Sequence, residues 1–388
     1  MGGGKAPLEQ HQLRDSRMEL LRLIAMLLIV AHHVVLFSNL NLPALQPSDL
    51  VYQLNILLAM LMVSGGKVGV FMFGAISGYF LIQKPGPKPS RLVKLWLCVL
   101  FYSAGGFALA CALHWQDFSV WELIRTLLPL TFGRYWFMTA FMLLMLLSPY
   151  FNLGLRSLSK AQFKALLVML FLLWYLLSTI LWPAPLYGEK FYCGEFEALC
   201  YAYACGAYWR LFPPELRFRR CLGLLCLTVL ALTLVFVLCQ FHARGRSEIM
   251  IHYIFFARWH SVFVPVIALS LLSCALALKP YYSRLINYLA QGAFGVYLIH
   301  SCVSLKGPLA LTFWPLQNQI YTDTFALWAV VTVLISYLAL ALIDDIRHLL
   351  LTPLSEFLSR ALARFDERYL LFYVPSHDRG STTDHGGQ

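Results

Sequence analysis

The chain has little charge: only 13% of its 388 residues are Asp, Glu, Lys or Arg, while 60% are apolar. A typical soluble domain has about 25% charged and about 45–50% apolar residues. A soluble protein of this length could not bury so much apolar surface, and a disordered chain would not contain it. The composition, with a mean hydropathy of +0.67, therefore excludes both classes and predicts a polytopic membrane protein.

The sequence also has no paired cysteine motif and no repeat. Its ten cysteines include no Cys-x-x-Cys pair, so neither a zinc site nor a disulfide framework is indicated. We find no short-period repeat and no inverted repeat of the kind common in secondary transporters. The first apolar segment is too long for a cleavable signal peptide, and no small-x-small cleavage site follows it.

Apolar segments long enough to cross the hydrocarbon core as helices, which takes about 20 residues, recur along the chain. The ten predicted spans are roughly 19–39, 54–82, 92–113, 135–155, 163–182, 196–211, 219–241, 254–278, 285–305 and 324–346. Spans two and eight are long, so we expect each to be tilted or broken, span two at Gly65-Gly66 and span eight at Pro265.

The basic residues orient these spans. With the N-terminus in the cytoplasm, 21 of the 30 Lys and Arg residues fall in cytoplasmic segments and six in external loops. Arg22, Lys67 and Arg258 lie within or at the ends of spans. This asymmetry explains most of the net charge of +11 and predicts that both termini are cytoplasmic.

The predicted architecture is an all-α polytopic membrane protein in three parts. Residues 1–18 form a cytoplasmic tail, residues 19–346 the ten-helix membrane domain, and residues 347–388 a second cytoplasmic tail. The last part is polar and is expected to be disordered from about residue 376.

Ionisable residues inside a span indicate function, because their burial is unfavourable. Arg22 and His33 are eleven residues apart, so they share one face of span one, about 16 Å apart along the axis. Glu19 lies on that face and can hold the guanidinium of Arg22. The pattern favours His33 as a general base and Arg22 as a binder of an anionic ligand. The alternative is an interfacial arginine and a histidine that bonds a neighbouring helix, which we prefer for His32.

Two further pairs are informative. His300 lies about as deep in span nine as His33 does in span one, so the two histidines can face a common cavity. Arg91 and Lys94 share a face where span three begins, and two cations there can hold phosphates. The alternative for the cations is that they only mark the cytoplasmic side.

Five motifs occur in order across residues 17–346. They are Glu19-Leu-Leu-Arg22 with ten residues to His33, Gly69-Val-Phe-Met-Phe with Ser77-Gly78-Tyr79-Phe-Leu, Arg91-x-x-Lys94, Tyr135-Trp136-Phe137 with Ser148-Pro149, and Phe294-Gly-Val-Tyr-Leu-Ile-His300. Together they resemble the acyltransferase 3 family of bacterial integral-membrane O-acyltransferases. Lys94 stands where that family commonly has arginine; it keeps the charge but lacks the bidentate fork.

The resemblance implies transfer of an acyl group, usually acetyl, from cytoplasmic acyl-CoA to a hydroxyl of a cell-envelope polysaccharide or glycolipid. It also implies a multi-pass protein of the bacterial inner membrane, with His33 catalytic and Arg22 in donor binding. The candidate residues are catalytic His33, Glu19 and His300; donor-binding Arg22, Arg91, Lys94, Ser77 and Tyr79; and acceptor-binding Trp136, Tyr135, Arg134 and Arg258. We expect no metal, no permanently bound cofactor and no nucleic-acid partner, with acyl-CoA as co-substrate and lipid around the spans. A homo-oligomer is compatible with the sequence.

Two other functions stay open at this level. One is a secondary transporter or exporter of a small anionic or glycan-type substrate, in which the buried histidines and arginine would bind substrate or relay protons. The other is a membrane assembly protein whose polar residues only pair helices. The motif order favours the acyltransferase.

Overall fold

The computed structural model describes residues 14–38, 49–84, 86–181, 193–243 and 254–368, and within them the chain is helical and contains no strand. The α-helices are α1 (Ser16–Phe37), α2 (Leu50–Leu81), α3 (Pro89–Ala112), α4 (Val120–Leu127), α5 (Trp136–Ser157), α6 (Lys160–Phe171), α7 (Leu177–Ile180), α8 (Glu195–Leu211), α9 (Phe218–Ala243), α11 (Phe263–Ala277), α12 (Arg284–Gln291), α13 (Ala293–His300), α14 (Val303–Phe313) and α15 (Phe325–Arg368). A π-turn, η1 (Leu172–Leu176), joins α6 to α7, and two 3₁₀ turns are η2 (Ile254–Ala257) and η3 (Pro315–Asn318).

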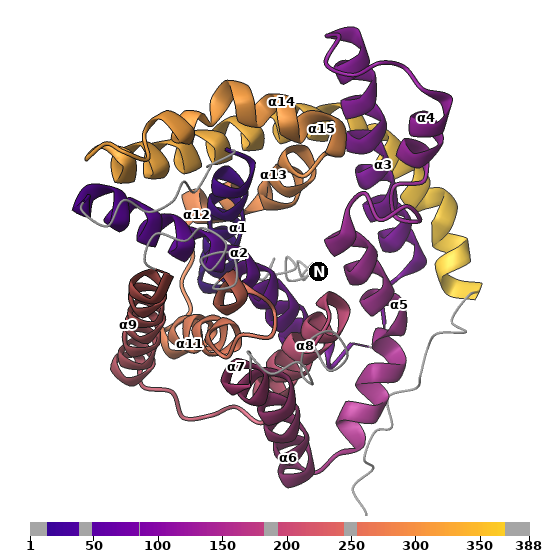
Figure 1. Ribbon diagram of the computed structural model, residues 1–388. Helices are drawn as coiled ribbons and strands as arrows, with labels where there is room; N and C mark the ends of the chain where they lie inside the picture. The colour runs from indigo at the N-terminus through magenta and orange to yellow at the C-terminus, as the bar shows by residue number, and fades with distance from the viewer. Residues whose placement is uncertain (1–13, 39–48, 85, 182–192, 244–253, 369–388) are drawn as a thin grey trace, which may run out of the picture.

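Helices α1 and α2 form the centre of the molecule, and the other helices surround them (Figure 1). α1 and α2 pack along each other, α8 packs along α2, and α11 contacts α2 and α9. On another side, α12, α13 and α15 pack against α1. The two motifs that contain His33 and His300 therefore lie on neighbouring elements.

Side-chain caps define where the central helices begin. Asp15 accepts a hydrogen bond from the backbone N–H of Arg17 at the start of α1, and Asp49 accepts one from Tyr52 at the start of α2. Ser159 and Gln162 form a reciprocal capping box at the start of α6. These caps satisfy N–H groups that have no partner inside the helix.

Pro149 lies inside α5 without ending it. Proline has no N–H, so the carbonyl of Met145, four residues earlier, loses its usual helical donor. The hydroxyl of Ser148 donates to that carbonyl at 2.8 Å. The Ser-Pro pair therefore keeps a helix in lipid without an unsatisfied carbonyl group.

Seven helices are long and apolar enough to cross a membrane, and the count is eight if the bent pair of Arg284–His300 and Val303–Leu311 is one span. They correspond to predicted spans one to five, seven, nine and ten. The remaining two regions are shorter, because α8 has 17 residues and α11 has 15. The predicted count of ten and the orientation of the termini stay predictions.

Three predicted details of the spans are corrected. The α2 helix continues through Gly65-Gly66, because both glycines are buried against α1 and helical hydrogen bonding is kept. The interruption of span eight precedes α11, and Pro265 lies in its first turn, where proline is tolerated. The last helix continues past residue 346 to Arg368, while residues 369–388, which include the predicted disordered tail, lie outside the described residues.

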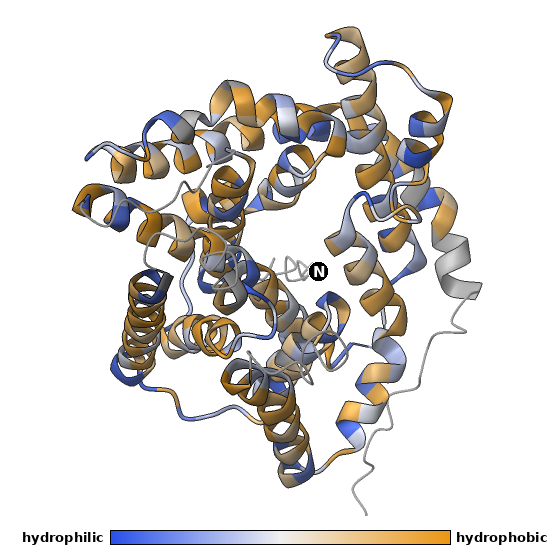
Figure 2. Cartoon of the chain, viewed as in Figure 1, coloured by the Kyte–Doolittle hydropathy of each residue, from blue (hydrophilic) through white to orange (hydrophobic). Residues whose placement is uncertain are grey.

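The outer surface of α9 is apolar, as expected for a helix in contact with lipid. Figure 2 shows this helix as apolar along its length and hydrophilic at its ends. Its exposed side chains recur every three or four residues: Leu227, Leu230, Leu234, Leu238 and Phe241. A stripe of this kind on the outer face of a helix is typical of contact with lipid.

Close packing of α2 and α8 depends on glycine at two points. A Cβ at Gly206 would overlap the backbone carbonyl of Ala75, and a Cβ at Gly78 would overlap that of Tyr203. Backbone atoms cannot move aside as side chains do. The pair is the small-residue contact expected where helices associate in lipid.

We predict that Gly206→Ala lowers the midpoint of thermal unfolding of the purified protein, because overpacking a tight interface costs about 1–3 kcal/mol. Gly223→Ala on α9 is the matched control, since an added methyl there meets nothing within 4 Å. The control should unfold at or slightly above the wild-type temperature, because alanine favours helix. Equal unfolding of Gly206→Ala and wild type would contradict the packing argument.

Candidate active site

Two histidines from different helices are hydrogen-bonded to each other. Nε2 of His300, at the end of α13, lies 2.9 Å from Nδ1 of His33 on α1. Nδ1 of His300 lies 2.6 Å from the carbonyl oxygen of Val296. The predicted proximity of these two residues is confirmed; their chemical roles stay predictions.

The carbonyl of Val296 determines where the protons of this pair lie. A carbonyl oxygen only accepts, so Nδ1 of neutral His300 has the proton and its Nε2 is an acceptor. Nδ1 of His33 must then donate, and Nε2 of neutral His33 keeps its lone pair. No described residue hydrogen-bonds that nitrogen. The arrangement is that of a general base held in one tautomer by a second group.

A break in span nine places His300. The helix ends at His300 and resumes at Val303, with the two pieces bent by 92°. Contacts hold the chain on both sides of this break. Before it, the Tyr135 hydroxyl donates to the carbonyl of Leu298 at 3.1 Å; after it, the Cys302 thiol lies 3.7 Å from the carbonyl of Tyr102. Broken backbone at membrane depth is tolerated where it is buried in protein, as it is here. The sequence predicts a single span over residues 285–305, and the bend within it is a correction.

Aromatic rings and cations surround His33. Its ring stacks on Phe37 at 5.0 Å, and Phe37 stacks on Trp314 at 6.1 Å. The ammonium group of Lys306 lies 5.5 Å from the ring of Phe37. Lys67 on α2 is also in electrostatic contact with His33. Two lysines, Lys67 and Lys306, therefore act electrostatically on His33.

His32 serves helix packing. Its Nδ1 lies 2.6 Å from the carbonyl of Val63, and its ring lies against Gly66, where a Cβ would overlap it. This contact joins α1 to α2. The alternative that we preferred for His32 in the sequence, a hydrogen bond to a neighbouring helix, is confirmed.

The other end of α1 carries a second charged cluster. Glu19 is 3% exposed and forms ion pairs with Arg22 and Arg14. The Arg22 guanidinium also lies 5.6 Å from the Phe80 ring. The predicted Glu19–Arg22 contact is confirmed, and it leaves further N–H donors of Arg22 for a ligand.

Two candidates near this end face other partners. The Tyr79 ring lies 5.2 Å from the guanidinium of Arg210, which donates to Gln83. The Ser77 hydroxyl donates to the Phe73 carbonyl of its own helix at 2.8 Å. Arg91 and Lys94 are exposed on α3. Their donor-binding roles stay predictions.

Of the acceptor candidates, two lie near Lys67 and one forms an ion pair elsewhere. Trp136 contacts Lys67 through its ring, and Arg258 is exposed but in electrostatic contact with Lys67. Arg134 instead pairs with Glu122 at 2.6 Å. This hydrogen bond from Arg134 holds the pKa of Glu122 below its usual value, so the pair persists at neutral pH and is lost as the pH falls.

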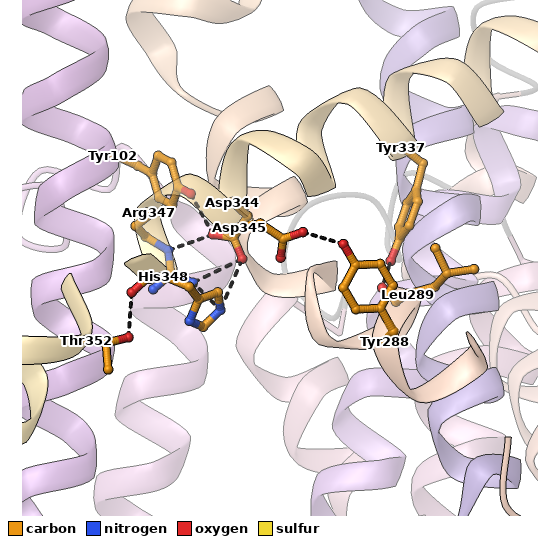
Figure 3. Close-up of polar contacts among 9 residues, drawn as sticks. All are labelled: Tyr102, Tyr288, Leu289, Tyr337, Asp344, Asp345, Arg347, His348 and Thr352. Atoms are coloured by element: carbon orange, nitrogen blue, oxygen red, sulfur yellow. Dashed lines mark hydrogen bonds and ion pairs between the residues drawn. The ribbon is translucent and has the colours of Figure 1, made fainter. Parts of the chain in front are cut away.

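A buried ion pair in the middle of α15 was not predicted. Asp344 is fully buried and accepts hydrogen bonds from Arg347 at 2.6 and 3.0 Å and from the Tyr102 hydroxyl at 2.6 Å (Figure 3). The Asp344 carboxylate lies against Gly295, where a Cβ would overlap it. The pair therefore connects α15 to α3 and to α13, the helix that ends at His300.

The sequence analysis did not single out Asp344. The available signal was Asp344 and Arg347 three residues apart, a spacing at which side chains meet on a helix. It had noted Lys67 as a charge inside a span but gave it no role. Trp259 and Lys306 had no signal in spacing, since they approach the site only through the fold.

Apolar helices with lipid-facing stripes around a histidine pair define a multi-pass membrane protein. Comparison with known families matches residues 15–343 to acyltransferase 3, described as an acyltransferase domain. This match covers most of the 388 residues, so the chain belongs to the acyltransferase 3 family and is a membrane acyltransferase. No curated protein and no solved structure matches it.

We predict that Asp344→Asn destabilises the protein by about 3–5 kcal/mol, because Arg347 would remain in a buried position without its counter-charge. The matched control is Asp345→Asn, whose carboxylate accepts only an exposed hydrogen bond from Tyr288. Thermal or denaturant unfolding of both variants in detergent checks this. Equal stability of the two variants would contradict a structural role for the pair.

Proposed function

We propose that this acyltransferase moves an acyl group, acetyl in the first instance, from cytoplasmic acyl-CoA to a hydroxyl of a cell-envelope polysaccharide or glycolipid. His33 is the general base. The observation that supports this is the chain of hydrogen bonds from the Val296 carbonyl through His300 to His33. It leaves Nε2 of His33 with a lone pair in a site lined by rings.

The reaction follows from that lone pair. Nε2 of His33 takes the proton of the acceptor hydroxyl as its oxygen attacks the thioester carbonyl. The carbon–sulfur bond breaks, the acyl group stays on the acceptor oxygen, and the proton passes from His33 to the leaving thiolate of CoA. His300 accepts a hydrogen bond from Nδ1–H of His33 throughout and keeps the ring in place. His300 is thus a positioning residue.

Arg22 binds the donor in this proposal. It lies about 16 Å from His33 along α1, and a flexible pantetheine arm separates the phosphates of CoA from the thioester. A guanidinium fixed by Glu19 presents its remaining donors to phosphate oxygens. Arg91 and Lys94, which share a face of α3, add positive charge at the cytoplasmic entrance.

We predict that His33→Gln lowers acyl-dependent CoA release by about 10²–10⁴-fold, the range typical of a general base. His300→Gln should retain more activity than His300→Ala, because the glutamine amide oxygen can accept a hydrogen bond from Nδ1–H of His33. Thiol release by the purified protein, with mass spectrometry of the acceptor, measures both effects.

His114→Asn is the control, because His114 is exposed, and asparagine tolerates its positive φ of 55°. Full activity of His33→Gln would overturn the base assignment. Substrate-driven uptake into vesicles, without CoA release from any acyl-CoA, would favour a transporter instead.

We predict that Arg22→Gln raises the KM for acyl-CoA by about tenfold or more, because a charged hydrogen bond to phosphate contributes about 1.5–3 kcal/mol. The KM for the acceptor should change little. Steady-state kinetics with each substrate varied in turn separates the two. A larger effect on the acceptor than on the donor would contradict the assignment.

A further inference from the structure

Lys67 is an intramembrane lysine whose ammonium group is held by two tryptophans. Its Nζ lies 4.6 Å from the ring of Trp259 and 5.3 Å from that of Trp136. The two indoles meet edge to face at 5.5 Å. Ring faces attract a cation, but they do not accept the three N–H bonds of an ammonium group.

The charge of Lys67 lacks a close counter-charge. Within the described residues no carboxylate lies at ion-pair distance from it. Glu195, at the start of α8, acts on it only through longer-range attraction, and Arg258 acts in the opposite sense. A cation in a membrane helix is stable when something pairs with it, so a site of this kind suits an anionic ligand.

Trp259 gives a second, independent indication of a ligand. It is only 7% exposed, and its indole N–H has no hydrogen-bond partner among the described residues. Buried donors are nearly always satisfied, and an unsatisfied one calls for an explanation. A ligand oxygen near Lys67 and Trp259 would accept from both.

The surroundings of His33 point to the same sign of charge. Lys67 and Lys306 are among the charged groups that act most strongly on His33, and none of these is a carboxylate. The region next to the base is therefore positive. Positive charge would do little for a neutral sugar hydroxyl. It would attract a substrate that has an anionic group beside the hydroxyl.

This region is distinct from the end of the molecule where we place the donor phosphates. Glu195, which acts on Lys67, begins α8, and Arg210, which contacts Tyr79, lies near its other end. Fifteen residues of helix separate them by about 22 Å. Arg22, beside Phe80, belongs to the Tyr79 end. The phosphates of CoA bound at Arg22 would therefore not reach Lys67.

We propose that Lys67, Trp136 and Trp259 form the acceptor subsite, and that the acceptor has an anionic group, carboxylate or phosphate, close to the hydroxyl that is acylated. That the bound anion is the acyl acceptor rests on the proposed function. The existence of an anion-binding site at Lys67 does not. A sugar acid of a glycan and the phosphate of a glycolipid share this chemistry.

Binding without acyl-CoA tests the site directly. The probes are methyl β-glucuronide, the 6-phosphate of methyl β-glucoside, and neutral methyl β-glucoside, titrated calorimetrically into the full-length protein in nanodiscs of zwitterionic lipid. We expect wild type to bind at least one anionic probe about tenfold more tightly than the neutral one. Lys67→Met should abolish the preference, Lys67→Arg should keep it, and Lys164→Met, on the exposed side of α6, should not change it.

Kinetics with acyl-CoA provides the second readout. Lys67→Met should raise the KM for the anionic probe about tenfold and change the KM for the neutral probe much less. The stronger of the two anionic probes tells whether the natural group is a carboxylate or a phosphate.

Two results would overturn the proposal. One is equal binding of charged and neutral probes by wild type, which needs no variant to fold. The other is an equal loss, in Lys67→Met, of acceptor-independent hydrolysis and of transfer to the neutral probe, which would assign Lys67 to the thioester oxygen. Lys67-dependent anion binding without any CoA release would instead refute the proposed function and leave the anion site standing.

Discussion

The hydrogen bond between His33 and His300 depends on a carbonyl group four residues upstream in the same helix. Val296 fixes the proton of His300, His300 fixes the proton of His33, and Nε2 of His33 is left with its lone pair. In most hydrolytic triads a carboxylate orients the histidine and holds its tautomer. A neutral imidazole fulfils the same geometric role without placing a negative charge in lipid, where such a charge is unfavourable.

The break in span nine brings residues beyond His300 back to the histidine pair. Had α13 continued straight, the residues after His300 would have followed the same axis, whereas the 92° bend turns α14 across the site. The bend places Lys306 over Phe37 and Trp314 behind it. The buried pair of Asp344 and Arg347 supports the other side of α13, through Gly295. The position of His300 thus depends on contacts from α1, α3 and α15 together.

Much of the fold could be predicted from the sequence, since apolar length indicates which segments form long helices suited to crossing a membrane. The starts of α1, α2 and α3 lie within a few residues of the predicted spans. The Glu19–Arg22 contact follows from helical spacing. The breaks could not be predicted, because they depend on tertiary contacts: Gly65-Gly66 suggests a break but serves packing against Leu28 and His32, and nothing around Ser301 marks a bend.

The site shows the same limit at the level of single residues. His33 and His300 could be related by depth, because depth is a linear count along each helix. Lys67 and Trp259 could not, since which ring faces an ammonium group depends on the rotation of α2 against the chain before α11. The charge balance around His33 is therefore a property of the folded molecule. In the proposed function, Lys67 and Lys306 near His33 would select the substrate by its charge, which His33 alone could not do.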